Sequence, residues 1–283
     1  MKKITPSKNR WMMMVGLALA LCPVQSYALS VTTTGDATTL TNSILGSGIT
    51  LVGTPTYTGA TIASGTFTGG IASGIGIESG ILLTSGSAQL AVGPNNTESA
   101  TGNNGLSGDG DLNSLIPGFS TLDATVLTFS FTTTTGNLFF NYAFGSEEYN
   151  EYVGSSFNDV FGFFLDGSNL ALIPGTSTPV SINNVNNGSN SAYFVDNSTV
   201  PTFNVQYDGF TKVLTAQLLG LAPGTHTIKL AIADAGDHIL DSGVFIQGGT
   251  FSGTPTNPVP EPTTLLLLGA ALAGVGLVRR KLA

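Results

Sequence analysis

Acidic side chains gather in two short windows of this sequence, and no other residues are better suited to chemistry. The first window spans residues 147–159 and holds four acids in 13 positions, with no lysine or arginine among them. The second spans residues 234–241 and follows an apolar run. Carboxylates that lie this close repel one another unless a cation joins them. The acids of the two windows are Glu147, Glu148, Glu151, Asp159, Asp234, Asp237 and Asp241.

Calcium is the cation that such windows suit best. Ca²⁺ takes several carboxylate and amide oxygens in an irregular shell, and loops at strand ends supply them. The only cysteine, Cys22, lies within residues 1–28. Residues 29–258, which we call the body, therefore have no disulfide and would gain stability from a bound ion. We therefore predict that the two windows meet around one structural calcium. The expected ligands are Glu147, Glu148, Asn158, Asp159, Asp234, Asp237 and Asp241.

Three alternatives use the same acids or their surroundings differently. The carboxylates would be turn caps that accept hydrogen bonds from backbone N–H groups. A glycan-binding module would stack exposed Tyr or Phe rings on sugars beside the acidic loops. A glycoside hydrolase would use two carboxyls as acid and base. The body's histidines, His226 and His238, accompany no Gly-x-Ser-x-Gly motif, so we expect no catalytic residue and no enzyme.

The charge of the body excludes several kinds of partner. Between residues 29 and 258 there are two lysines, no arginine and 16 acids, a net charge of −14. Such a surface repels nucleic acid and anionic lipid. We therefore expect no nucleic-acid partner.

Short apolar runs separated by turn residues predict an all-β body, an antiparallel, jelly-roll-like β-sandwich. A short helix capped by Asp36 is expected near residues 40–45, a loop at 94–115, a strand at 180–185, and a hairpin over 203–218. In that hairpin Asp208-Gly209 would form the turn. The expected core residues are Phe129, Phe131, Phe140, Phe163, Leu230 and Ile232.

The two ends of the chain read as targeting segments outside this fold. Residues 1–28 have a basic start, an apolar run and a small-x-small site ending at Ala28, as a secretory signal peptide does. Residues 253–258 form a linker. Residues 259–283 then hold Pro260, Glu261 and Pro262, a 16-residue apolar run at 263–278 and a basic end. As a helix, that run is about 24 Å long, enough to cross a membrane with local thinning.

This tail resembles the PEP-CTERM sorting signal, whose Pro-Glu-Pro motif, apolar helix and basic end are all present in order. The resemblance implies a Gram-negative bacterium that makes extracellular polysaccharide. It also implies an exosortase partner that cuts near Pro260-Glu261-Pro262. The helix would then hold the protein in the inner membrane only until it is cleaved.

The body, residues 29–252, resembles the choice-of-anchor L domain, a family of bacterial surface domains. The resemblance rests on GIGIESGILLTSG (74–86), FGSEEYNEYVGSSFNDVFGFFLDG (144–167), VSINNVNNG (180–188) and ADAGDHILDSGVF (233–245). It implies an exported protein of the cell surface or matrix. With it we expect an adhesive or structural role in a biofilm, with extracellular polysaccharide or other surface proteins as candidate partners.

Overall fold

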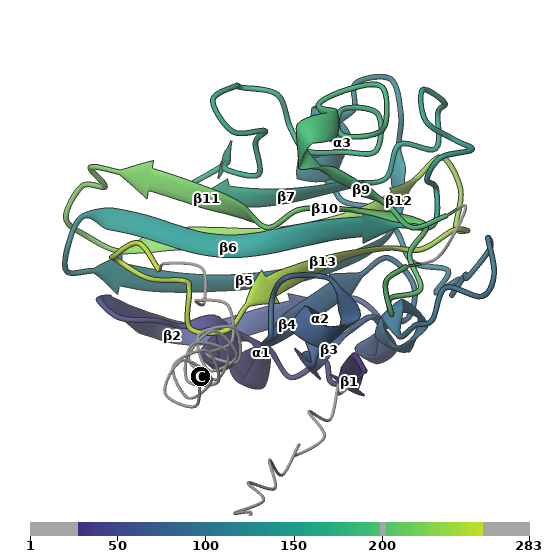
Figure 1. The fold of residues 1–283 in the computed structure, drawn as a ribbon. Helices are drawn as coiled ribbons and strands as arrows, with labels where there is room; N and C mark the ends of the chain where they lie inside the picture. Colours follow the sequence, from purple (N-terminus) through teal and green to yellow (C-terminus); the bar gives the residue numbers. More distant parts are fainter. Residues whose placement is uncertain (1–27, 199–201, 257–283) are drawn as a thin grey trace, which may run out of the picture.

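The protein is seen in a computed structural model that describes residues 28–198 and 202–256 (Figure 1). Most elements are short strands, as the turn-rich sequence predicts. They are, in order, β1 (Ser30–Thr33), α1 (Ala37–Ile44), β2 (Ile49–Thr58), η1 (Thr61–Ala63), β3 (Ser64–Thr68), α2 (Gly70–Ser73), β4 (Ser79–Thr84), η2 (Ala88–Ala91), α3 (Gly110–Leu115), β5 (Thr121–Thr133), β6 (Asn137–Ser146), β7 (Val160–Leu165), β8 (Ser168–Asn169), η3 (Ser191–Tyr193), β9 (Phe194–Asp196), β10 (Gly209–Thr211), β11 (Leu214–Leu219), β12 (His226–Ala235) and β13 (Ser242–Gln247).

The strands form two sheets, and every strand pairing within them is antiparallel. The first sheet has the order β1-β3-β4-β13-β6-β10-β9, with β11 also paired to β6. The second has the order β2-β5-β12-β7-β8. The two sheets pack face to face (Figure 1). The predicted all-β antiparallel sandwich is therefore confirmed.

The main core lies between the sheets and is rich in aromatic rings. Phe251, which follows the last strand, places its ring centroid 5.0 Å from those of Phe129 and Phe131 and 5.4 Å from that of Phe140. Such pairs contribute about 0.5–1.5 kcal/mol each beyond the area they bury. All six predicted core residues, Phe129, Phe131, Phe140, Phe163, Leu230 and Ile232, are buried here.

Each sheet also has apolar residues on its outer face, with a small core of its own. Helix α3 covers the second sheet, where Leu112 and Ile116 pack with Phe164 and the alanines of β12. The first sheet is covered by the chain around Tyr207 and Phe210. Both faces of the central strands are therefore buried, which explains why β6 and β7 have almost no polar alternation.

The predicted hairpin over residues 203–218 is wrong. Residues 204 and 206 donate their backbone N–H groups to Ser73 and Ala91 instead of pairing with 211–218. Strand β10 pairs with β9 and β6, and β11 pairs with β6. Residues 203–208 pack on the outer face of the first sheet, and β10 and β11 are strands of that sheet, so the alternation of this stretch did not require a hairpin. Asp208 is fully buried and is no turn residue at the surface.

Of three other local predictions, the short helix is confirmed, the strand at 180–185 is wrong, and the loop at 94–115 ends earlier than predicted. Helix α1 is capped by Asp36, whose Oδ2 accepts the Thr39 N–H at 2.9 Å, and it buries Leu40 and Ile44 as predicted. The expected strand at 180–185 is not formed, because a tight turn is closed there by the Asn184 and Val185 N–H groups bonding to Ser181. The expected loop at 94–115 ends in helix α3.

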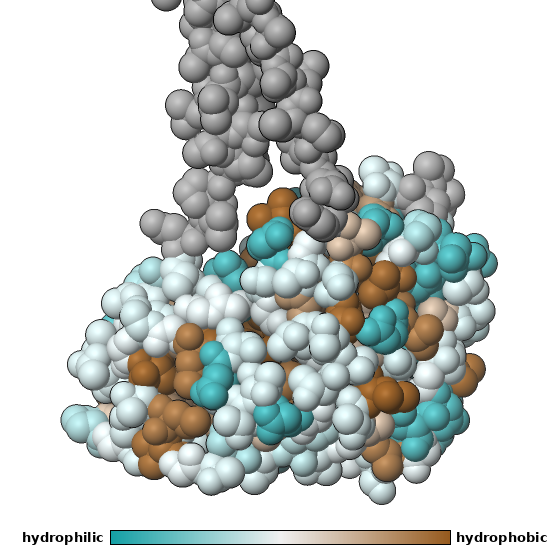
Figure 2. Space-filling view, turned by 90° about the horizontal axis from the view of Figure 1, so that it is seen from below, coloured by the Kyte–Doolittle hydropathy of each residue, from teal (hydrophilic) through white to brown (hydrophobic). Residues whose placement is uncertain are grey.

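The two predicted targeting segments fall mostly outside the described residues. Pro260, Glu261, Pro262, the apolar run at 263–278 and residues 1–27 are not among them, and Ala28 is exposed at their beginning. Within residues 28–198 and 202–256, no helix is long and apolar enough to cross a membrane. On the face that Figure 2 shows, the apolar residues form separate patches divided by polar ones.

Candidate functional site: a buried acid network

The strand register brings the two acidic windows to the same end of the sandwich. Ser242, at the start of β13, is opposite Ser146 at the end of β6. Val160, at the start of β7, is opposite Ala233 near the end of β12. The two windows also touch directly, because the Glu147 N–H donates to the Asp241 carbonyl at 3.1 Å. This end lies on the right in Figure 1.

Seven carboxyl groups are buried at this end, and we call them the acid network. None of them is more than 1% exposed. Burial raises the pKa of Glu147 and of Asp234, and the charges of neighbouring members, Asp208 and Asp159 respectively, raise each of them further. The members of the acid network are Asp123, Glu147, Glu148, Asp159, Asp208, Asp234 and Asp241.

Asp159 and Asp241 each have both carboxylate oxygens hydrogen-bonded. Oδ1 of Asp159 accepts the Ala235 N–H at 2.9 Å, and its Oδ2 accepts the Ser242 hydroxyl at 2.7 Å. Asp241 accepts two backbone N–H groups, those of residues 87 and 102, at 3.0 and 2.8 Å. Asp159 therefore joins the first window to β12 and β13, and Asp241 joins the second window to the loop after β4.

Gly86 makes room for the Asp241 carboxylate. A Cβ at this position would lie 1.9 Å from Oδ2 of Asp241, closer than any real contact. A side chain at residue 86 would therefore expel the carboxylate from its place. The last glycine of the GIGIESGILLTSG segment thus serves the acid network.

Four members of the network have oxygens with no hydrogen-bond partner. Both Oδ atoms of Asp234 are unpartnered, as are Oε1 of Glu147, Oε2 of Glu148 and Oδ2 of Asp208. The Ser85 hydroxyl lies near enough to Asp234 to oppose the rise of its pKa, but it makes no hydrogen bond of ordinary geometry to it. An unsatisfied buried polar atom costs about 1–3 kcal/mol, and more when it is charged. These oxygens therefore require either a proton or a cation.

Members of the acid network have raised pKa values, because burial favours the protonated form of a carboxyl group. Burial raises the pKa of Glu147 and of Glu148 to about 9. It raises the pKa of Asp159 to about 7 and that of Asp234 well above its ordinary value. Without a cation, both glutamates are therefore neutral acids at pH 7.

Tyr207 adds a neutral oxygen to the same place. Its hydroxyl is buried and has no hydrogen-bond partner, and a Cβ on Gly243 would lie 2.2 Å from it. Burial raises the pKa of Tyr207, and the neighbouring charges of Asp241 and Glu147 raise it further. Sequence reasoning missed this residue because the 203–218 stretch looked like a surface hairpin.

Asp123 is the member that contacts a group able to carry a positive charge. It lies in β5 with φ of 50° and accepts the Asn104 N–H at 3.0 Å. Nδ1 of His238 lies 2.8 Å from its Oδ2. Sequence reasoning missed Asp123, although a single acid inside an apolar strand is a signal that could have found it.

Two of the expected ligands point elsewhere. Oδ1 of Asn158 accepts the Asn183 N–H at 2.9 Å, and Oδ1 of Asp237 accepts the Ile239 N–H at 3.1 Å. Asp237 affects the site only through its charge, which adds to the effect of burial in raising the pKa of Glu148. Glu151 is exposed.

The carboxylates do not by themselves form a finished metal site. Over residues 28–198 and 202–256, no three His, Cys, Asp or Glu side chains are arranged so that they could hold a metal ion. A cation at this end would therefore need neutral oxygens, such as hydroxyl groups, beside one or two carboxylates. Ca²⁺ accepts such mixed oxygen shells.

Two comparisons with known sequences and structures find no match, and the third is informative. Neither a curated protein nor a solved structure matches this chain. The family model described as "Choice-of-anchor L domain" matches residues 29–252, and the one described as "PEP-CTERM protein-sorting motif" matches residues 258–281. The first match covers the whole sandwich, including both windows of the acid network.

Proposed function

Because the chain belongs to the choice-of-anchor L domain family and ends in a PEP-CTERM sorting motif, we propose a structural calcium site in an exported surface domain. The sorting motif implies processing by an exosortase and delivery toward the surface. Our proposal adds that the acid network binds one Ca²⁺, and that the domain serves as a non-enzymatic adhesive or matrix component of a biofilm.

The observation that carries the calcium proposal is the state of Asp234. Its side chain is fully buried, both of its oxygens are unpartnered, and the nearby Asp159 is an acid as well. Among the described residues, neither lysine reaches this end, because Lys229 is bound by Asp109 and Asp111 and Lys212 lines a separate groove. A divalent ion would neutralise two carboxylates at once.

The residues around Asp234 offer the types of oxygen donor that calcium binds. Asp234 and Asp159 would supply the charge, and the hydroxyls of Tyr207 and Ser85 are neutral oxygens beside them. Hard cations prefer oxygen donors of both types. When bound, the ion would supply the positive charge that this end lacks and would tie the β6–β7 and β12–β13 loops together.

Burial of the acids also supports a non-enzymatic role. A glycoside hydrolase needs two carboxyl groups that reach the sugar from a cleft. The members of the acid network are at most 1% exposed, so a sugar ring has no access to them. Their arrangement suits stabilisation of the fold rather than turnover of a substrate.

Metal analysis of the exported protein tests the proposal directly. Elemental analysis should find about one calcium per chain, and the melting temperature should fall when a chelator replaces excess calcium. Asp111→Asn is the matched control, since Asp111 binds Lys229 on the outer face of the second sheet and should leave the calcium response intact. Asp208 is unsuitable as a control because it is buried beside Glu147. Identical melting in calcium and chelator, with no metal found, would overturn the proposal.

A further inference from the structure

We propose that the groove between the segment after β8 and strand β11 binds an acidic saccharide, a chain of sugar rings that carry carboxylates. The groove is separate from the acid network, and its occupant does not depend on the calcium proposal. It has a volume of about 610 Å³, within the range of sites for small ligands. The residues of the groove that carry the argument are Leu172, Tyr193, Lys212, Leu214, Thr215 and Gln217.

Lys212 supplies the positive charge of the groove. It is exposed, and its backbone N–H donates to the Tyr193 carbonyl at 2.8 Å, which fixes the two residues side by side. In the part of the chain that the structure describes, its ammonium makes no ion pair, whereas Lys229 has two carboxylate partners. The Lys212 ammonium is therefore free to pair with a carboxylate in the groove, and this local attraction acts against the repulsion of a body of net charge −14.

The rest of the groove has the surface that a sugar ring needs. Tyr193 and Leu172 are half-buried, and Leu214 is buried beneath them, so the floor is apolar. An apolar or aromatic floor accepts the C–H face of a sugar, while a few polar groups fix its orientation. The alternation of β11 exposes Thr215 and Gln217. Gln217 supplies an amide, and the Thr215 hydroxyl, which donates to Oδ1 of Asn141 at 2.8 Å, can still accept a hydrogen bond from a sugar hydroxyl.

The charge of the groove favours a carboxylate over a phosphate. A phosphate group carries up to two charges and is usually held by arginine or by several N–H groups of a helix N-terminus or glycine-rich loop. This groove offers one ammonium, and the body contains no arginine. A uronic acid has one charge per ring and presents hydroxyl groups on both sides of it. One lysine with flanking Thr and Gln side chains matches that pattern.

The test is a titration of the exported protein with short oligogalacturonate, compared with the same oligosaccharide as its methyl ester. We expect binding of the acid form and at least tenfold weaker binding of the ester, because the ester has no charge to pair with the Lys212 ammonium. Lys212→Gln should weaken binding of the acid form by about tenfold, and Lys212→Arg should restore it. Thr50→Ala, on the exposed edge strand β2, is the matched control.

Several outcomes would overturn the groove as the site. One is equal binding of the acid and the ester, and another is unchanged binding by Lys212→Gln. Absence of binding by a wild-type protein that melts normally is a third. All titrations are run at one calcium concentration and repeated with Asp234→Asn. Loss of binding in Asp234→Asn, with binding retained in Lys212→Gln, would also place the uronate outside the groove.

Discussion

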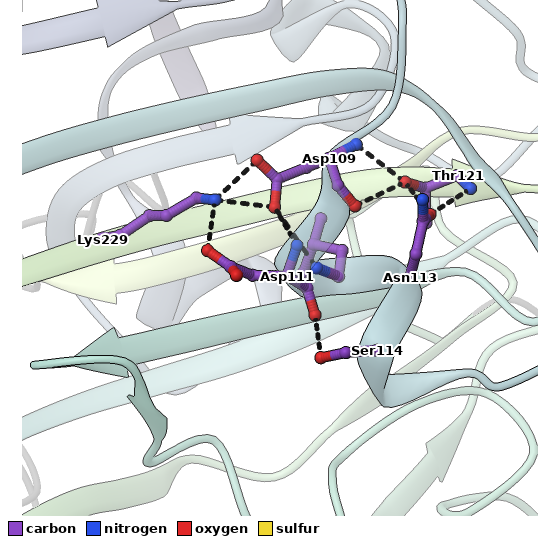
Figure 3. Close-up of polar contacts among 7 residues, drawn as sticks. Asp109, Asp111, Asn113, Ser114, Thr121 and Lys229 are labelled. Atoms are coloured by element: carbon purple, nitrogen blue, oxygen red, sulfur yellow. Dashed lines mark hydrogen bonds and ion pairs between the residues drawn. The ribbon is translucent and has the colours of Figure 1, made fainter.

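Two clusters of carboxylates flank strand β12, and only one of them contains its own cation. On the outer face, Nζ of Lys229 lies 2.6 Å from Oδ2 of Asp109 and 2.8 Å from Oδ2 of Asp111 (Figure 3). At the end of the same strand, Asp234 lies beside Asp159 with both of its oxygens unpartnered. Asp234 follows Lys229 by only five positions, yet the lysine does not contact the second cluster.

The geometry of the strand explains this separation. Side chains alternate across a sheet, and β12 has a register irregularity between Ile232 and Asp234. Lys229 faces α3 and keeps partial contact with water, with a side chain 21% exposed. Although partial burial opposes it, the carboxylates of Asp109 and Asp111 raise the pKa of Lys229 above its ordinary value. The Lys229 cluster is partly solvated and contains its own cation. The buried Asp234 has no partner, which points to a missing ligand.

The largest effect that separates the two clusters should come from pH. In the unfolded chain a glutamate has its ordinary pKa of 4.5, and burial raises the pKa of Glu147 and Glu148 to about 9. The folded state therefore binds more protons between these values, so stability falls as pH rises from about 5 to about 9. The slope is about 1.4 kcal/mol per pH unit for each group.

Melting curves measured in chelator between pH 5 and pH 9 should show this decline as a loss of more than about 10 °C. In excess calcium the decline should be smaller, because the positive charge of an ion on Asp234 and Asp159 would lower the pKa of the nearby glutamates. A melting temperature that is flat with pH in chelator would contradict the burial of unpaired acids.

Asp234→Asn should abolish the response to calcium. The amide keeps the shape of the side chain but removes its charge, so calcium should no longer raise the melting temperature. Saturating calcium should stabilise the wild type by about 4 kcal/mol, or about 10 °C in a domain of this size. Calorimetry in calcium and in chelator measures both values. A variant that still gains about 10 °C from calcium would place the ion elsewhere.

Lys229→Met should break the paired cluster and leave the other untouched. Asp109 and Asp111 would then repel each other without their cation, at a cost of about 1–2 kcal/mol, since the pair is only partly buried. The melting temperature should fall by about 2–8 °C, and by the same amount in calcium and in chelator. A loss that depended on calcium would show that the two clusters are coupled.

The smallest effect concerns a second paired acid, Asp166. Nδ1 of His226 lies 2.6 Å from its Oδ2, and Nε2 lies 2.8 Å from the Ala222 carbonyl. The hydrogen bond to Asp166 raises the pKa of His226 above its usual value. The pair therefore contributes stability at low pH and loses it as pH rises through this raised pKa.

Nuclear magnetic resonance titration of the His226 ring tests this pair. In Asp166→Asn its pKa should return toward 6.5, with a change in melting temperature of a few degrees at most. Glu147→Gln serves as the control, because it lies in the unpaired acid network. An unchanged His226 pKa in Asp166→Asn would show that the ring is set by the Ala222 carbonyl alone.

Local patterns in the sequence were enough to predict the all-β class, the six core residues and the two acidic windows. Those features depend on local patterns: period-two alternation, turn residues and the spacing of charges along the chain. The N-cap of α1 at Asp36 is local in the same way. The sorting motif near the C-terminus is also a run of contiguous residues, as is the predicted signal peptide.

Which acids share a site depends on the packing of the two sheets and could not be predicted from local patterns. Asp123 joins the acid network from β5, and Asp208 joins it from a segment that packs over the first sheet. Asn158 and Asp237, although they lie in the windows, turn to backbone N–H groups. Whether a carboxylate is buried, paired or exposed depends on strands that are distant in sequence but adjacent in the sheets. Residue spacing therefore located the acids, and only the pairing of distant strands distinguished those that have a partner from those that lack one.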